Sequence, residues 1–144
     1  MSFLKASVPD LEIPTDHALL ALLLKIAENN NINYIISGSN IASESILPRT
    51  WAYGHMDWKY VKNIHKKFGK VKLNDFYHYT MYDYVNYRIL KNIKTIQILN
   101  YINYNKEEAK KIIKKELDWE DYGSKHHESI YTRFVQAYIL PIEI

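Results

Sequence analysis

The sequence predicts an α/β domain with a small parallel sheet. Two short runs of apolar and β-branched residues, 33–37 and 94–101, are typical of strands, and segments with helical spacing lie before, between and after them. The order helix, strand, helix, helix, strand, helix, helix is the order of an α/β domain. Because a complete doubly wound sheet has more strands, we expect part of a larger domain, or one that borrows strands from a partner.

The first long helix is predicted over residues 16–28, directly after Pro14 and Thr15. Its apolar residues are spread almost all round the helix: Ala18, Leu19, Leu20, Leu22, Leu23, Ile26 and Ala27. A helix with no polar face packs on more than one side. We therefore expect this helix to be deeply buried.

The middle of the chain predicts a strand, a turn and several helices. Strand 33–37 runs into a turn at residues 38–40, with a short helix expected over 42–46. Asp57 is placed to cap a helix over 58–68, with Gly69 at the position after its end. Its solvated face would carry Lys62, Lys66 and Lys67.

The last part of the chain is expected to be mostly helical. A helix is predicted in the second half of 76–92, followed by the strand 94–101. Asn105 with Glu108 three residues later resembles a capping box for a helix that ends at residue 117. Ser124 would open a last helix over 125–140, which Pro141 stops.

Composition narrows the class of protein. The length of 144 residues is typical of one domain, and 47% hydrophobic residues with 4 Gly and 4 Pro exclude a disordered chain. Without cysteine there is no disulfide or thiolate metal site.

The longest apolar run, 18–24, is too short to span a bilayer, and residues 1–10 do not resemble a signal peptide, so we expect a cytoplasmic protein. The net charge of +3 comes from 16 Lys and 3 Arg against 16 acidic residues, which favours nucleic acid only weakly.

A first candidate site is the turn after strand 33–37. In open parallel sheets ligands bind outside the carboxyl ends of the strands, where small residues let backbone N–H groups approach a phosphate or ribose. Ser37, Gly38 and Asn40 supply such a turn. Glu44, one helical turn further on, would reach Mg²⁺ or a ligand hydroxyl. The alternative is a plain turn in which Ser39 or Asn40 caps the next helix.

A second candidate is the start of the last helix. Lys125, Ser129, Thr132 and Gln136 would form one polar stripe, with Ile130, Phe134, Ala137 and Tyr138 as apolar surface. Lys125 and His126 in a first helical turn are disfavoured by the helix dipole unless an anion is present. His126 and His127 are adjacent and point to different faces, which argues against zinc. The alternative is a solvated helix start.

Aromatic residues mark a third candidate in the segment 48–58. Trp51 and Trp58 stand there among Arg, His and Tyr, and flat rings of this kind stack on sugars or bases. The alternative is that both tryptophans anchor a long loop to the core.

Taken together, these motifs resemble the N-acetyl sugar amidotransferases of bacterial surface-polysaccharide (LPS) synthesis, which are ATP pyrophosphatases with a Rossmann-like, adenine nucleotide alpha-hydrolase-like fold. The matching parts are residues 36–40, Glu44, Trp51, residues 99–102, residues 118–129, residues 132–134 and residues 138–141. The segment 118–141 is the most specific of them. The resemblance implies an ATP- and Mg²⁺-dependent conversion of an acetamido group on an activated, nucleotide-linked sugar to an acetamidino group, with ammonia from a glutaminase subunit.

The resemblance also implies roles for individual residues. The nucleotide would be held by Ser37, Gly38, Asn40 and Glu44, with Mg²⁺ at Glu44; the catalytic group would be Lys125, His126, Glu128 and Arg133; and the substrate would contact Trp51, Ser129 and Thr132. The expected partners are the glutaminase, a missing N-terminal half or a second copy, and the nucleotide sugar, without nucleic acid or a membrane span.

One departure from the family bears on activity. The family holds the ATP phosphates in a Ser-Gly-Gly-Lys-Asp-Ser type loop, and no such loop occurs in these 144 residues. Position 124 is Ser where the family repeats Gly. We therefore expect the C-terminal part of a larger enzyme, inactive alone and weak in ATP binding. The alternative is a non-catalytic module that binds a nucleotide sugar or a partner; a tRNA-binding relative would require a concentrated basic surface.

Overall fold

The computed structural model describes residues 1–41, 56–121, 123, 129–134 and 137–138. The chain divides into two compact units, Met1–Ile98 and Leu99–Ile144, and each is described by itself. The single domain expected from the sequence stays a prediction. Within the described ranges, no helix has both the length and the apolar character needed to cross a membrane.

The first unit contains a two-stranded parallel sheet. Strand β1 (Tyr34–Ser37) pairs with β2 (Lys94–Gln97), and Tyr34 lies opposite Lys94 while Ser37 lies opposite Gln97. This confirms a mixed α/β protein with a small parallel sheet. The expectation that the second strand continues to residue 101 is wrong, because the chain turns into the 3-10 helix η3 (Ile98–Tyr101) directly after Gln97. Because Ser37 and Gln97 are the last residues of their strands, both described strands end at the same edge of the sheet.

Helix α2 (Ile13–Asn29) confirms the first predicted helix but begins earlier. Pro14 lies in its first turn, where the missing N–H leaves no helical bond unmade. Its buried side chains recur every three or four residues and form one stripe: Ile13, His17, Ala21, Leu24 and Ala27. Leu19 is 64% exposed and Ile26 is 46% exposed. The expectation of burial on several sides is therefore wrong, because one stripe already provides the contact with the core.

The buried stripe of α2 packs against Ile35 of strand β1. Leu24, Ala27 and Ile93 form the centre of this core, and partly buried residues pack against it: Leu20, Ile35, Tyr84 and Tyr87. Alternation along β1 turns Ile35 toward the core, whereas Tyr34 and Ile36 stay 58% and 71% exposed. In β2 the pattern differs: Thr95, opposite Ile35, is exposed, whereas Ile96, opposite Ile36, is half-buried.

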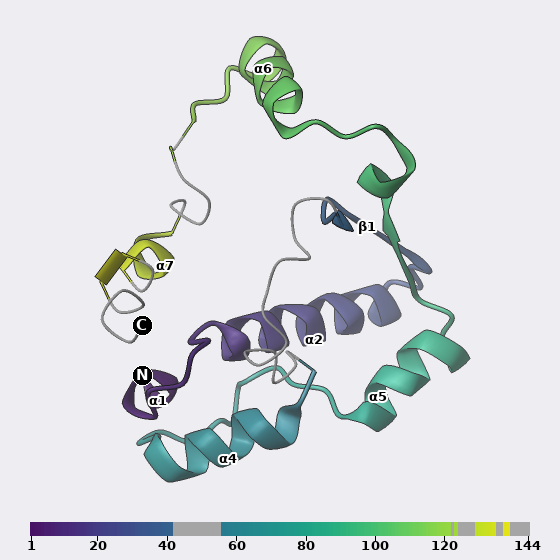
Figure 1. Ribbon diagram of the computed structural model, residues 1–144. Helices are drawn as coiled ribbons and strands as arrows, with labels where there is room; N and C mark the ends of the chain where they lie inside the picture. Colours follow the sequence, from purple (N-terminus) through teal and green to yellow (C-terminus); the bar gives the residue numbers. More distant parts are fainter. Residues whose placement is uncertain (42–55, 122, 124–128, 135–136, 139–144) are drawn as a thin grey trace. The chain divides into compact units, whose positions relative to one another are not determined.

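Helix α4 (Trp58–Phe68) begins and ends where the sequence predicts. The Asp57 carboxylate accepts a hydrogen bond from the Tyr60 backbone N–H at 3.0 Å, which satisfies one free N–H of the first turn. The helix packs on α1 (Ser2–Lys5) and on α2, which Figure 1 shows running beside it. The Phe3 and Tyr60 rings meet edge to face at 5.7 Å.

Gly69 follows α4 directly, but not in the left-handed conformation typical of a helix-ending glycine. Its backbone is extended, with φ −80° and ψ 155°. Glycine is required here by a close approach: a Cβ atom at this position would lie 2.5 Å from the His65 carbonyl oxygen and 2.6 Å from its ring. The residue therefore allows the following loop to pass tightly over the end of the helix.

We expect Gly69→Ala to lower the free energy of unfolding by about 1–3 kcal/mol, because the added methyl group overpacks against backbone. Gly38→Ala is the matched control, since a Cβ there meets nothing within 4 Å. It should leave stability unchanged or raise it by about 0.4–1 kcal/mol through the unfolded chain. Urea unfolding of both variants checks this; equal stabilities would contradict the close approach.

The helix expected in the second half of 76–92 is confirmed as α5 (Met81–Val85), which continues into the π-helix η2 (Asn86–Leu90). Thr80 and Asp83 form a capping box at its start. The hydrogen bonds that Asp83 accepts from the Thr80 backbone and hydroxyl lower the pKa of that carboxyl. This cap was not expected from the sequence.

The second unit contains α6 (Lys106–Leu117) and α7 (Ile130–Phe134). The Asn105 side chain caps α6 by accepting from the backbone N–H groups of Glu107 and Glu108 at 3.0 and 3.3 Å, as its position predicts. The last predicted helix is wrong at residue 129, which forms a bend before α7. Its predicted start at 124–128 lies outside the described residues.

Candidate functional site

Three polar side chains meet where both strands of the sheet end. The hydroxyl oxygens of Ser37 and Ser39 lie 2.8 Å apart, and the Ser39 backbone N–H donates to Ser37 Oγ at 3.2 Å. Gln97 donates from Nε2 to Ser39 Oγ at 3.0 Å. We call Ser37, Ser39 and Gln97 the strand-end cluster.

Parallel pairing produces this cluster. Because Ser37 lies opposite Gln97, the last side chains of both strands reach the same edge of the sheet. The sequence pattern did not identify Gln97, which lies within the predicted strand 94–101, as a site residue. Its place at the end of β2, matching that of Ser37 at the end of β1, is the signal that could have identified it.

The cluster can offer hydrogen bonds to a neutral ligand. Two hydroxyl groups carry two hydrogens, and only one of these lies between the two serine oxygens. The other can be donated to a ligand oxygen, and none of the three side chains carries a charge. Hydroxyl and amide groups of this kind suit the ribose or base of a nucleotide better than its phosphates.

The rest of the expected nucleotide site is only partly described. Open space lies beside Gly38, as a ligand approaching the backbone requires. Asn40 is buried, with 6% of its surface exposed. Glu44 and Trp51 lie outside the described residues, so a Mg²⁺ site at Glu44 stays a prediction. Among residues that are described, no group of three or more His, Asp or Glu side chains could hold a metal ion.

The expected catalytic segment belongs to the second unit. The Ser129 hydroxyl accepts from the Thr132 backbone N–H at 3.4 Å, and the Ser129 carbonyl accepts from the Arg133 N–H at 2.9 Å. Ser129 thus caps α7 and does not continue a polar helical stripe. Thr132 is buried, whereas Arg133 is exposed. Ile130, which the sequence predicts as apolar surface beside the stripe, is 91% exposed.

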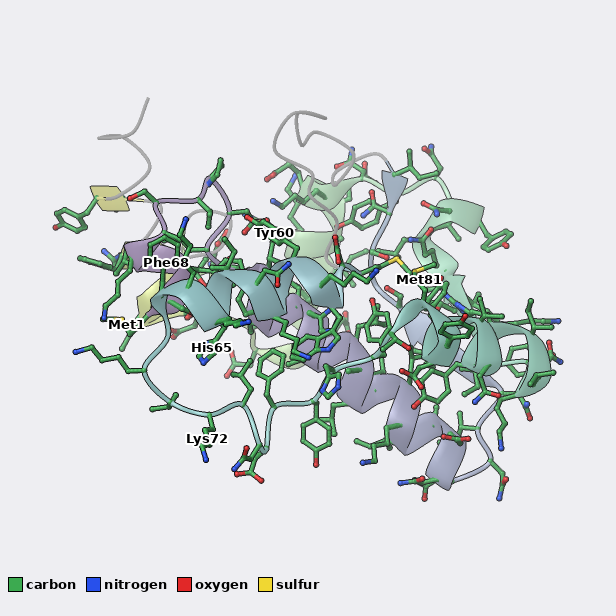
Figure 2. All side chains as sticks on the ribbon, turned by 90° about the horizontal axis from the view of Figure 1, so that it is seen from below. Met1, Tyr60, His65, Phe68, Lys72 and Met81 are labelled. Carbon is green, nitrogen blue, oxygen red and sulfur yellow. The ribbon has the colours of Figure 1, made fainter. Side chains whose placement is uncertain are left out.

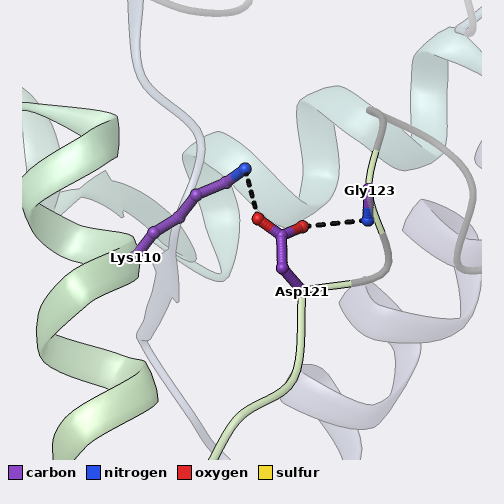
Figure 3. A network of polar contacts seen from close by, with 3 residues as sticks. All are labelled: Lys110, Asp121 and Gly123. Carbon is purple, nitrogen blue, oxygen red and sulfur yellow. Dashed lines mark hydrogen bonds and ion pairs between the residues drawn. The ribbon is translucent and has the colours of Figure 1, made fainter.

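The remaining expected catalytic residues, Lys125, His126 and Glu128, lie outside the described part of the chain. Asp121, a few residues before them, accepts hydrogen bonds from a side chain and from the backbone (Figure 3). One of its carboxylate oxygens accepts from Lys110 Nζ at 2.8 Å and the other from the Gly123 backbone N–H at 2.9 Å. The Lys110 contact, and then the Gly123 contact, hold the pKa of Asp121 below its usual value. Gly123 has φ +93°, which glycine adopts without strain.

Trp58 combines packing with access to a cavity. Its ring stacks on His78 at 4.1 Å between ring centres, and buried His17 lies at 5.8 Å. This supports the anchoring alternative for Trp58. The ring also borders a cavity of about 780 Å³, which is lined by Met56, Asp57, Trp58, Lys59, Lys62, Thr80, Met81 and Tyr82. That volume is within the range of ligand sites.

These observations define a mixed α/β protein with a polar cluster at the carboxyl ends of two parallel strands. No protein-family model, no curated protein and no solved structure matches the chain. The family resemblance therefore stays a prediction.

Proposed function

We propose that the strand-end cluster binds the nucleoside part of a nucleotide, within an ATP-dependent N-acetyl sugar amidotransferase that converts an acetamido group to an acetamidino group. The observation that carries the proposal is the meeting of Ser37, Ser39 and Gln97 where both parallel strands end. Ligands of open parallel sheets bind at this edge because loops, not strands, continue from it. The motif resemblance supplies the reaction.

The lack of charge on the strand-end cluster indicates which part of ATP it would contact. The cluster has hydroxyl and amide groups but no cation, and the chain's sequence has no loop of the type that cradles a triphosphate. Ser37, Gly38 and Asn40 are proposed to contact the nucleoside, and Glu44 to bind Mg²⁺. The phosphates of ATP would be held by a second polypeptide, and ammonia would come from a glutaminase subunit.

The second unit is proposed to act on the sugar. Lys125, His126 and Glu128, with the exposed Arg133, would face the reacting acetamido group, and Thr132 would contact the substrate. Trp51 belongs to the first unit and is proposed separately as a substrate contact. Ser129 is less suited to substrate binding because its hydroxyl caps α7.

The test is titration calorimetry of the chain with AMP and with ATP plus Mg²⁺. ATP should bind no more tightly than AMP, because the cluster engages only the nucleoside. Ser39→Ala and Gln97→Ala should each weaken AMP binding by about fivefold, the value of one hydrogen bond near 1 kcal/mol. Thr95→Val, on the same strand and same sheet face as Gln97, should leave it unchanged. Low-micromolar ATP binding that AMP does not reproduce would contradict the proposal.

A second candidate function is a non-catalytic module that binds a nucleotide sugar. The cavity of about 780 Å³ beside Trp58 favours it, since aromatic and thioether walls with two lysines suit a sugar carrying a diphosphate. Tyr82 lines this cavity and its ring is 90% exposed, so Tyr82→Ala removes a wall without opening the core. Binding of a nucleotide sugar that falls in Tyr82→Ala but not in Ser39→Ala would favour this function.

A further inference from the structure

Helix α4 and the loop after it carry a dense group of lysines. Residues 58–74 contain six lysines and no aspartate or glutamate. All six are exposed: Lys59, Lys62, Lys66, Lys67, Lys70 and Lys72. We call these six residues the lysine surface. Within the described part of the chain, none of them has a carboxylate at ion-pairing distance.

Helix α6 shows that lysine content alone does not produce such a surface. Residues 106–121 contain five lysines but also six acidic residues. Two of these lysines form ion pairs, Lys110 with Asp121 at 2.8 Å and Lys115 with Glu116 at 3.2 Å. The charge of this segment is therefore balanced locally, whereas the charge of the lysine surface is not. An unbalanced cluster attracts a polyanion.

The loop that carries Lys70 and Lys72 is held against α4 by His65. The Val71 carbonyl oxygen accepts from His65 Nε2 at 2.7 Å, so in the neutral ring Nδ1 accepts from the Ser2 hydroxyl at 3.2 Å. Figure 2 shows His65 beneath α4 and Lys72 on the loop that curves below it. Val71 is 72% exposed between the two lysines. The loop, which His65 bonds to α4, therefore exposes the apolar Val71 side chain between Lys70 and Lys72.

We propose that the lysine surface binds the anionic face of a phospholipid membrane, with Val71 entering between the headgroups. Groups of four to eight lysines or arginines are typical of such binding, and an apolar side chain adds the second contribution that stable attachment requires. Lysine stems also extend along apolar material while their charges stay in water. This goes beyond the proposed nucleotide site and does not depend on it.

The same features argue against nucleic acid as the partner. Phosphate and base recognition favours arginine, and the segment 58–74 contains none. Binding of single strands needs free aromatic faces. In this segment Trp58 stacks on His78, Tyr60 packs on Phe3, and the Phe68 ring has Lys67 Nζ at 5.5 Å from its centre, so all three rings already have a neighbour.

Vesicle co-sedimentation of the full chain tests the proposal. Vesicles with about 30% phosphatidylglycerol in phosphatidylcholine should bind it, and pure phosphatidylcholine should not. K66Q/K70Q/K72Q should weaken binding on the order of a hundredfold, at about tenfold or less per lysine. K106Q/K111Q/K114Q removes the same charge from α6 and should change binding by less than about threefold. Val71→Ser should weaken binding by about tenfold.

Three other outcomes would contradict membrane binding by the lysine surface. Equal losses in the two triple variants would show that net charge, not the lysine surface, causes binding. Unchanged binding in Val71→Ser together with tighter binding to poly(U) RNA than to vesicles would identify a nucleic acid as the partner. No binding to anionic vesicles at low salt would overturn the proposal outright. All seven substituted side chains are exposed, so near-ultraviolet circular dichroism should match the parent chain in every variant.

Discussion

Replacing Leu24 with alanine is expected to lower the free energy of unfolding by about 2–5 kcal/mol. The Leu24 side chain has no exposed surface and packs with Ala27 and Ile93 at the centre of the core beside the sheet. Truncation removes buried methyl groups and leaves a cavity that the sheet and helix fill only in part. Since a domain of this size is stable by about 5–15 kcal/mol, the variant loses a large share of it. Urea unfolding measures the loss.

Leu19→Ala in the same helix is the matched control. Leu19 is 64% exposed, so the same substitution should change stability by less than about 0.5 kcal/mol. A loss as large as that of Leu24→Ala would mean that α2 is covered on a second side, as its composition alone predicts. Comparing Leu24→Ala with Leu19→Ala therefore tests whether α2 is buried along one stripe, as in the structure, or on several sides, as its hydrophobic sequence predicts.

The second large effect is expected at Tyr79 in alkaline solution. Burial, and then the neighbouring Tyr84, raise the pKa of Tyr79 to about 12 from the usual value of 10.0. Below about pH 9 the phenol is neutral in both the folded and the unfolded chain, and its titration does not affect stability. Above pH 10 the unfolded chain loses the proton first, so stability falls as pH rises and is lower by about 2–3 kcal/mol near pH 12.

Tyr79→Phe should remove this part of the alkaline loss. It should also raise stability at neutral pH by about 1 kcal/mol or more, because the Tyr79 hydroxyl is buried and no residue in the described part of the chain forms a hydrogen bond with it. Tyr82→Phe, at a ring that is 90% exposed, should change neutral stability by less than about 0.5 kcal/mol. Urea unfolding at pH 7 and pH 11 makes the comparison. An unchanged alkaline slope in Tyr79→Phe would show that other groups cause it.

Local signals in the sequence predicted most of the described helices and both strands, but not α1 or the early end of β2. Asp57 and Asn105 were identified as caps because a cap depends only on the next three residues, and both side chains accept the expected backbone hydrogen bonds. The two strands were found for a similar reason, since short β-branched runs favour extended backbone wherever they pack. The prediction of a helix over 125–140 is wrong at Ser129, because the spacing of polar and apolar residues does not indicate the bend there.

Contacts between distant residues were decided only by the tertiary structure. The leucines of α2 are chemically alike, and the packing of Ile35 and Ile93 selects which of them are buried. Gln97 joins Ser39 across 58 residues because of the strand register, and His65 joins Ser2 across 63 residues by the packing of α1 on α4. The sequence by itself determined the elements, since these depend on local interactions. The lysines of α4 and its following loop are visible in the sequence, whereas the strand-end cluster depends on which strands meet, which no local pattern contains.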